Sequence, residues 1–278
     1  MRVTLLGTGS PIPDPARAGP ATLVRSHAAS VLFDCGRGVV TRLAGAGLFP
    51  SMLSAVLLTH LHSDHVCDLN DVITTHWVMS ASPTPLVVMG PSGTAEFVAR
   101  TLDMLEPDIG YRIAHHADLA QGPWVDVREV GAGDEFEIGD MYVRIGATDH
   151  RPVEPTLGYR LSAGDQSVVI AGDGVPCASL DELVLGASAY VQTVIREDLV
   201  RMIPSARLHD IIDYHSSVTE AAHTAQRGSV NALVLTHFVP ALNKATESQW
   251  RDLAKEFTGL LVLGEDLTTL DLDTMTLS

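Results

Sequence analysis

The sequence predicts a mixed α/β fold, an αββα sandwich in which helices cover two sheets that pack together. Apolar runs of strand length alternate with stretches of helical spacing along the 278 residues, and such chains pack helices outside sheets. Polar residues follow several of the predicted strands, and loops at one sheet edge are where sites are assembled. No linker or long charge run divides the chain, so we expect one domain over residues 1–278.

The expected elements follow the apolar pattern in chain order. Short apolar or β-branched runs predict strands, at 3–6, 31–33, 55–58, 85–89, 125–130, 142–145, 167–171, 231–235, 260–263 and 268–272. Apolar residues at helical spacing predict helices, at 94–105, 217–225 and 249–257. The glycine- and proline-rich stretch 7–20 indicates a loop.

Composition narrows the classes of function. The chain has 34 acidic and 18 basic residues, a formal net charge of −16, whereas proteins that hold nucleic-acid backbones need clustered lysine and arginine. The three cysteines form no C-x-x-C pair, which argues against a zinc ribbon or a disulfide framework. No apolar run is long enough for a membrane helix, and the apolar start is too short for a signal peptide. We therefore expect a cytoplasmic protein with no membrane partner.

One short segment concentrates the potential metal ligands. Directly after the predicted strand 55–58 come His60, His62, Asp64 and His65. Imidazole and carboxylate are ligands for zinc and similar divalent ions. His60 and His62 fall on one side of an extended turn. Asp64 and His65 are adjacent and diverge, so they can serve a second ion. The alternative is a solvated structural cluster, but placing these groups after an apolar strand without a ligand would be costly.

This segment resembles the H-x-H-x-D-H signature of the metallo-β-lactamase superfamily. Later motifs resemble its ribonuclease Z-like branch and occur in the order of that branch: Thr148-Asp149-His150, Gly158-Tyr159-Arg160, Gly172-Asp173-Gly174 and Leu235-Thr236-His237. Early motifs also match, namely Gly7-Thr8-Gly9-Ser10-Pro11, Phe33-Asp34-Cys35-Gly36 and Gly90-Pro91-Ser92-Gly93. The resemblance covers nearly the whole chain and includes actinobacterial ribonuclease Z-like proteins, some of which are labelled arylsulfatases. It implies the αββα metallo-β-lactamase sandwich, with the site on one edge between the sheets.

The resemblance also implies a dinuclear metal site. We expect two Zn(II) per chain, with Mn(II) or Fe as the alternatives. Three histidines would hold one ion: His60, His62 and His150. Three residues would hold the other ion: Asp64, His65 and His237. Asp173 would bridge the two ions.

Two metal ions about 3.5–4 Å apart lower the pKa of a shared water towards about 7, so that hydroxide attacks a phosphodiester. The leaving group then needs a proton, and His215 is the candidate, because its surroundings resemble the H-S-T motif of the branch, with Ser217 in place of threonine. The alternative is that His215 only precedes a helix capped by Ser216 or Ser217. Asp64 is the other candidate proton carrier, because the family uses it as ligand, base or both. Asp34 either orients a ligand histidine or shapes a turn.

Two features depart from the tRNA-processing members of the branch. Their protruding arm follows the G-Y-R motif, whereas residues 158–160 lead here through 161–166 straight into the next strand. Their H-E-A-T loop aligns with residues 192–195, which lack its histidine and glutamate. Together with the charge, these features favour a dinuclear zinc phosphodiesterase that acts on a small anionic ester and disfavour a nucleic-acid partner. The alternatives are tRNA 3′ processing, arylsulfatase or lactonase activity, and a non-catalytic metal-binding protein. A homodimer is implied by the resemblance alone.

Overall fold

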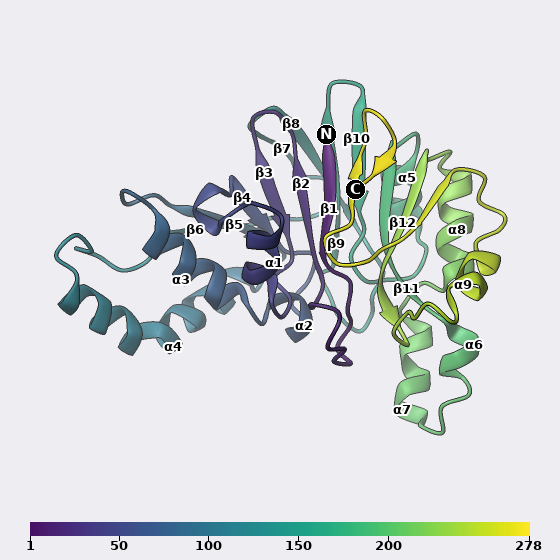
Figure 1. Cartoon of the computed structure of the whole chain (residues 1–278), viewed down its shortest axis with the longest axis horizontal. Coiled ribbons are helices and arrows are strands. Elements are labelled where there is room, and N and C mark those ends of the chain that lie inside the picture. Colours follow the sequence, from purple (N-terminus) through teal and green to yellow (C-terminus); the bar gives the residue numbers. More distant parts are fainter.

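The computed structural model describes residues 1–278 and confirms the αββα sandwich. Two mixed sheets lie face to face, and helices cover the outer face of each sheet (Figure 1). The first sheet has eight strands in the order β15-β14-β1-β2-β3-β4-β5-β6. These strands are β1 (Arg2–Gly7), β2 (Ala21–Arg25), β3 (Ser30–Phe33), β4 (Ala55–Leu57), β5 (Leu86–Gly90), β6 (Val125–Glu129), β14 (Thr269–Asp271) and β15 (Thr276–Leu277).

The second sheet has seven strands in the order β13-β12-β11-β10-β9-β8-β7. Its strands are β7 (Glu135–Ile138), β8 (Met141–Ala147), β9 (Leu157–Ala163), β10 (Gln166–Ile170), β11 (Ala189–Ile195), β12 (Ala232–Val239) and β13 (Leu260–Leu263). Strands β10 to β13 run parallel to one another, and β7 to β10 are antiparallel. Every residue of β11 and β12 is buried, because both faces of this parallel part are covered.

The helices divide between the two outer faces. The first sheet packs against α1 (Val39–Gly45), α3 (Leu69–Met79) and the start of α4 (Thr94–His115). The second sheet packs against α5 (Ala178–Val184), α8 (Val218–Arg227) and α9 (Glu247–Leu253). The remaining short helical segments are η1 (Pro50–Met52), α2 (Ser63–Val66), α6 (Glu197–Val200), α7 (Ala206–His209) and η2 (Asp210–Asp213). No helix combines the length and hydropathy that a membrane crossing requires.

A layer of apolar side chains between the sheets joins the two halves of the chain. Phe33 from β3 meets Tyr159 from β9 with 5.5 Å between the ring centroids, and both side chains are fully buried. The Tyr159 hydroxyl donates a hydrogen bond of 2.8 Å to the carbonyl of Leu58. Leu58 lies two residues before His60, so this bond joins the second sheet to the start of the ligand-rich segment.

Two predictions about individual elements turn out differently. The helix predicted over 94–105 continues in α4 past Pro107 to His115. Proline removes one backbone hydrogen bond inside a helix, and here that loss does not end the helix. His237 was expected after the strand 231–235, but it lies within β12. The strands β2, β7, β9, β11 and β15 are additional to the predicted set.

The connection between β9 and β10 is a tight turn, as the sequence predicts. Ala163 pairs with Gln166, so only Gly164 and Asp165 join the two strands, and Gly164 has the left-handed φ of 57°. No protruding arm leaves the sheet at this point.

Candidate metal centre

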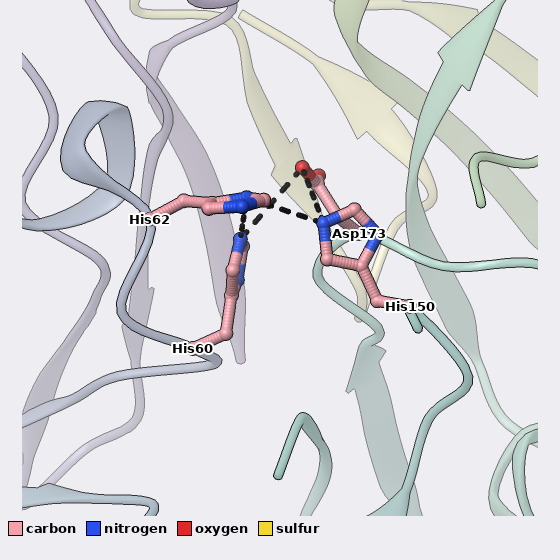
Figure 2. A group of neighbouring side chains, drawn as sticks. All are labelled: His60, His62, His150 and Asp173. Carbon is pink, nitrogen blue, oxygen red and sulfur yellow. Dashed lines mark hydrogen bonds and ion pairs between the residues drawn. The ribbon is translucent and has the colours of Figure 1, made fainter. Parts of the chain in front are cut away.

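The structure brings all seven predicted ligands together in two adjoining groups. The first group holds His60, His62, His150 and Asp173, and the second holds Asp64, His65 and His237. Within each group the potential ligand atoms lie within 4.8 Å of one another. Figure 2 shows the four side chains of the first group, which converge from three separate segments of the chain.

The N-terminal half supplies its residues from the connection that follows β4. His60 comes three residues after the end of β4, and α2 begins at Ser63, which places Asp64 and His65 in its first turn. Asp34 lies behind them at the end of β3 and accepts hydrogen bonds of 2.8 Å from both the Thr59 backbone N–H and His65 Nδ1. Of the two interpretations of Asp34, the structure therefore supports the orienting role, since a partner on Nδ1 directs Nε2 into the centre.

The C-terminal half supplies its residues from separate connections. Gly172, after β10, has a φ of 67°, and a Cβ placed there would lie 2.7 Å from the Thr59 Cβ. Only glycine suits this position, and it brings Asp173 against the N-terminal half. His237 has a φ of 54°, and the pairing of β11 with β12 shifts register next to it. This local irregularity turns the His237 side chain towards the centre from within a strand.

Asp173 lies between the two groups. Its Oδ2 is 3.4 Å from His65 Nε2 and 3.6 Å from His237 Nε2 in the second group. The same oxygen is 3.9 Å from the Nε2 atoms of both His60 and His150 in the first group. The other oxygen, Oδ1, is buried without a hydrogen-bond partner. One carboxylate thus faces both groups.

The hydrogen bonding inside the centre fits divalent cations. His62 Nδ1 lies 3.1 Å from His60 Nε2 and 3.2 Å from His150 Nε2. His150 Nδ1 donates to the Tyr214 carbonyl at 2.7 Å, so its Nε2 presents a lone pair. His65 Nε2 is buried and has no hydrogen-bond partner. Buried polar atoms without a partner, such as His65 Nε2 and Asp173 Oδ1, are costly alone. Converging imidazoles and carboxylates are the ligands that zinc and related ions take.

The pKa values of the buried histidines shift in opposite directions. Burial lowers the pKa of His60 well below its usual value and lowers the pKa of His150 to about 4. Both therefore favour the neutral imidazole, which is the form that binds a metal. Burial also acts to lower the pKa of His65, but the carboxylates of Asp173 and Asp34 outweigh it and raise that pKa well above the usual value.

His215 lies beside the centre but belongs to neither group. Its Nδ1 donates to the Ile211 carbonyl at 2.9 Å, and its Nε2 lies 3.3 Å from Asp173 Oδ2. Helix α8 is capped by Ser217, which forms a capping box with Glu220. A capped helix does follow His215, as the alternative interpretation expected, but the cap leaves the imidazole free to face the centre.

Two residues of the site were not singled out as functional from the sequence. The Thr59 hydroxyl donates to Asp34 Oδ2 at 2.9 Å. The Tyr214 carbonyl orients His150, and the Tyr214 ring centroid lies 5.2 Å from that of His150. Their only signal in the sequence is that each directly precedes a predicted site histidine.

Comparisons with known proteins agree with this geometry. The family model described as "Beta-lactamase superfamily domain" matches residues 29–238. A protein named "Ribonuclease Z" from Mycolicibacterium paratuberculosis is 58% identical over 276 residues, which cover 98% of this chain and 99% of that protein. A protein of the same name from Mycobacterium bovis is 56% identical over 270 residues, 96% of each chain.

Solved structures share the fold. The metallo-β-lactamase fold protein YhfI from Bacillus subtilis superposes with a TM-score of 0.75 at 21% identity, over 96% of this chain and 97% of that one. The short form of human tRNase Z superposes with a TM-score of 0.71 at 23% identity, over 98% of this chain and 99% of that one. The chain is therefore a metal-dependent hydrolase that belongs to the β-lactamase superfamily, in its ribonuclease Z-like branch.

Proposed function

We propose that this protein is an endoribonuclease that removes the 3′ trailer of tRNA precursors, and that residues 1–278 act as one domain. The observation that carries the proposal is the 58% identity to a protein named Ribonuclease Z over 98% of this chain and 99% of that protein. Because the match spans nearly all of both chains, the proposal does not depend on a segment that only the relative has.

This proposal reverses the preference for a small anionic ester that the sequence favoured. That preference rested on the net charge of −16 and on the missing arm. Relatives that match this chain almost end to end carry the name Ribonuclease Z, so an arm after β9 is not a condition of that name. Net charge is a sum over the whole surface, whereas metal ions govern the local field at the site. The comparisons give the small ester no comparable support.

The residues that would hold the metal ions are the two groups of the centre. We propose His60, His62 and His150 for one ion. Asp64, His65 and His237 would hold the other, with Asp173 as the bridge. Zinc suits this set of imidazoles and carboxylates, with Mn(II) or Fe as alternatives. When bound, the ions supply Lewis-acid polarisation of a phosphoryl oxygen and lower the pKa of a water molecule.

The protein itself supplies orientation and a proton. Asp34, through His65 Nδ1, and the Tyr214 carbonyl, through His150 Nδ1, fix two of the imidazole rings. His215 is held at Nδ1 by the Ile211 carbonyl. Its Nε2, which lies 3.3 Å from Asp173 Oδ2, is the atom that would donate a proton to the leaving ribose oxygen. Asp64 is the other proposed proton carrier, although its Oδ2 already lies 3.2 Å from His237 Nε2.

The decisive experiment compares substrates with one metal-loaded preparation. A tRNA precursor with a 3′ trailer, bis-p-nitrophenyl phosphate, p-nitrophenyl sulfate and a lactone are offered at physiological salt, and the RNA ends are mapped. We expect cleavage at the end of the acceptor stem, which chelator treatment abolishes. Turnover of the small phosphodiester with an intact precursor would instead support the small-ester hydrolase. Turnover of the sulfate or the lactone alone would support the third alternative.

A further inference from the structure

An aromatic wall borders the metal centre on the side of the second sheet. The rings of His150, Tyr214 and His215 contact one another in all three pairs. The centroids are 5.2 Å apart for His150 and Tyr214, 4.8 Å for Tyr214 and His215, and 4.9 Å for His150 and His215. The wall therefore includes both a proposed metal ligand, His150, and the proposed proton donor, His215, and Tyr214 contacts both rings.

Tyr214 is the most exposed member of this wall. His150 is fully buried and His215 is 8% exposed, whereas Tyr214 is partly exposed. Its phenol forms no hydrogen bond with the rest of the chain. One part of the ring packs against the two histidines, and the exposed part makes no contact within the chain.

The backbone around Tyr214 is fixed by the centre itself. Its carbonyl accepts from His150 Nδ1 at 2.7 Å, and the next residue, His215, donates to the Ile211 carbonyl at 2.9 Å. Ser216 Oγ donates to the Gly174 carbonyl at 2.8 Å, which ties the segment to the loop that carries Asp173. Because the backbone is fixed and the ring packs against two imidazoles, binding of a ligand against the ring should cost little conformational entropy.

We propose that Tyr214 is a substrate-binding residue on which the base of a nucleotide beside the scissile phosphate stacks. The reacting phosphate has to lie at the metal centre, and the ring of Tyr214 adjoins that centre. An aromatic ring accepts any base, because every base has a π-face. This contact suits a nuclease that acts on many tRNA precursors. The inference rests on the proposed function and names the contact by which the site holds the RNA end.

The test combines protein and substrate changes. Tyr214→Leu removes the ring, Tyr214→Phe keeps it, and Tyr111→Leu serves as the control because Tyr111 is 75% exposed on α4. Each is assayed on an acceptor-stem RNA with a 3′ trailer and on versions with an abasic nucleotide on one or the other side of the cleaved phosphate. Metal content and the Kd of a non-cleavable RNA analogue are measured in parallel.

We expect Tyr214→Leu to lose about 5- to 150-fold in kcat/KM and in RNA affinity, the range for one stacked base. Tyr214→Phe and Tyr111→Leu should stay within about twofold of wild type, because neither alters the stacked ring. At one of the two positions, the abasic penalty should largely disappear in Tyr214→Leu, because the partner of that base is already gone. This coupling isolates the stacking even if the leucine variant also lowers metal occupancy.

Equal abasic penalties in wild type and Tyr214→Leu at both positions would overturn the stacking role and leave the proposed function intact. The same conclusion follows if Tyr214→Leu binds and cleaves RNA as wild type does. A wild-type protein that leaves every RNA uncut would overturn the proposed function and this inference together. The two failures are therefore distinguishable by the behaviour of the wild type.

Discussion

The two sheets contribute to the metal centre in different ways. The connection after β4 in the first sheet supplies four residues that are close in sequence, His60, His62, Asp64 and His65. The second sheet supplies three residues that are far apart in sequence, His150, Asp173 and His237. One half of the centre is thus a local motif, and the other half exists only because β8, β10 and β12 end or bend at the same edge.

This difference shows where the centre is most vulnerable. The side-chain positions in the local half depend on one connection. Hydrogen bonds of Asp34 to Thr59 and His65 stabilise this connection. The dispersed half depends on the packing of one sheet against the other and on backbone irregularities at Gly172 and His237. Variants that act on one half, on the other, or on the contact between them should therefore give different combinations of metal loss, rate loss and instability.

The largest effect is expected where the two halves meet. Asp173→Ala should empty both metal positions and abolish activity, because Asp173 Oδ2 faces histidines of both groups. The loss of metal affinity and activity should exceed the roughly 10–100-fold loss that is typical when a residue that orients a metal ligand is replaced. Metal analysis of the purified variant checks this, with Asp165→Ala in the exposed β9–β10 turn as the matched control. Two fully occupied ions in Asp173→Ala would contradict the bridging role.

The next comparison separates a proposed ligand from the proposed proton donor. His60→Ala should lose metal and activity together. His215→Ala should keep both ions and the fold and lose about 10²–10⁴-fold in rate, the range for general acid catalysis. The loss should be greater for RNA, whose ribose oxygen leaves poorly, than for bis-p-nitrophenyl phosphate. Identical losses on the two substrates would mean that His215 positions the substrate and does not protonate the leaving group.

A smaller, one-sided effect is expected behind the local half. Asp34→Asn should weaken metal binding by about 10–100-fold, the usual effect of removing the partner of a ligand histidine, and mainly in the group that holds His65. Asparagine tolerates the left-handed φ of 58° found at Asp34, so this variant tests the carboxylate without straining the backbone. Competition with a chelator measures the two affinities. Equal weakening of both groups would show that Asp34 acts on the whole edge.

The smallest effect on the chemistry is expected at the contact between the sheets. Tyr159→Phe removes the hydroxyl that donates to the Leu58 carbonyl at 2.8 Å, and leaving a buried acceptor without its partner costs about 1–3 kcal/mol. We expect a lower Tm with nearly unchanged metal content, because the Phe33–Tyr159 ring packing remains. Loss of metal from Tyr159→Phe would show that this single bond fixes how the two halves of the centre meet.

Individual residues show which structural features the sequence patterns predicted and which they missed. The strand before His60 and the strand before Asp173 were predicted from continuous apolar runs, since both strands are covered on both faces. Strand β9 was not predicted. The end of α4 was misplaced, because Pro107 is tolerated inside that helix. His237 was predicted to follow a strand, but it lies inside β12 with a φ of 54°. No feature of the local sequence indicates this backbone conformation.

The sequence by itself determined the fold family and the local half of the centre, because four potential ligands within six residues and the motifs that follow them are features of covalent order. It also contained the dispersed residues, but only a resemblance to known proteins assigned them to one site. The tertiary structure decided that Asp173 lies between the two groups, that Asp34 holds His65, and that Tyr214 borders the centre. The first relation arises when the two sheets bury their shared apolar layer, which brings Asp173 Oδ2 to 3.4 Å from His65 Nε2, 108 positions earlier in the chain. The other two relations join residues 31 and 64 positions apart within one half of the chain, and they form when each half folds.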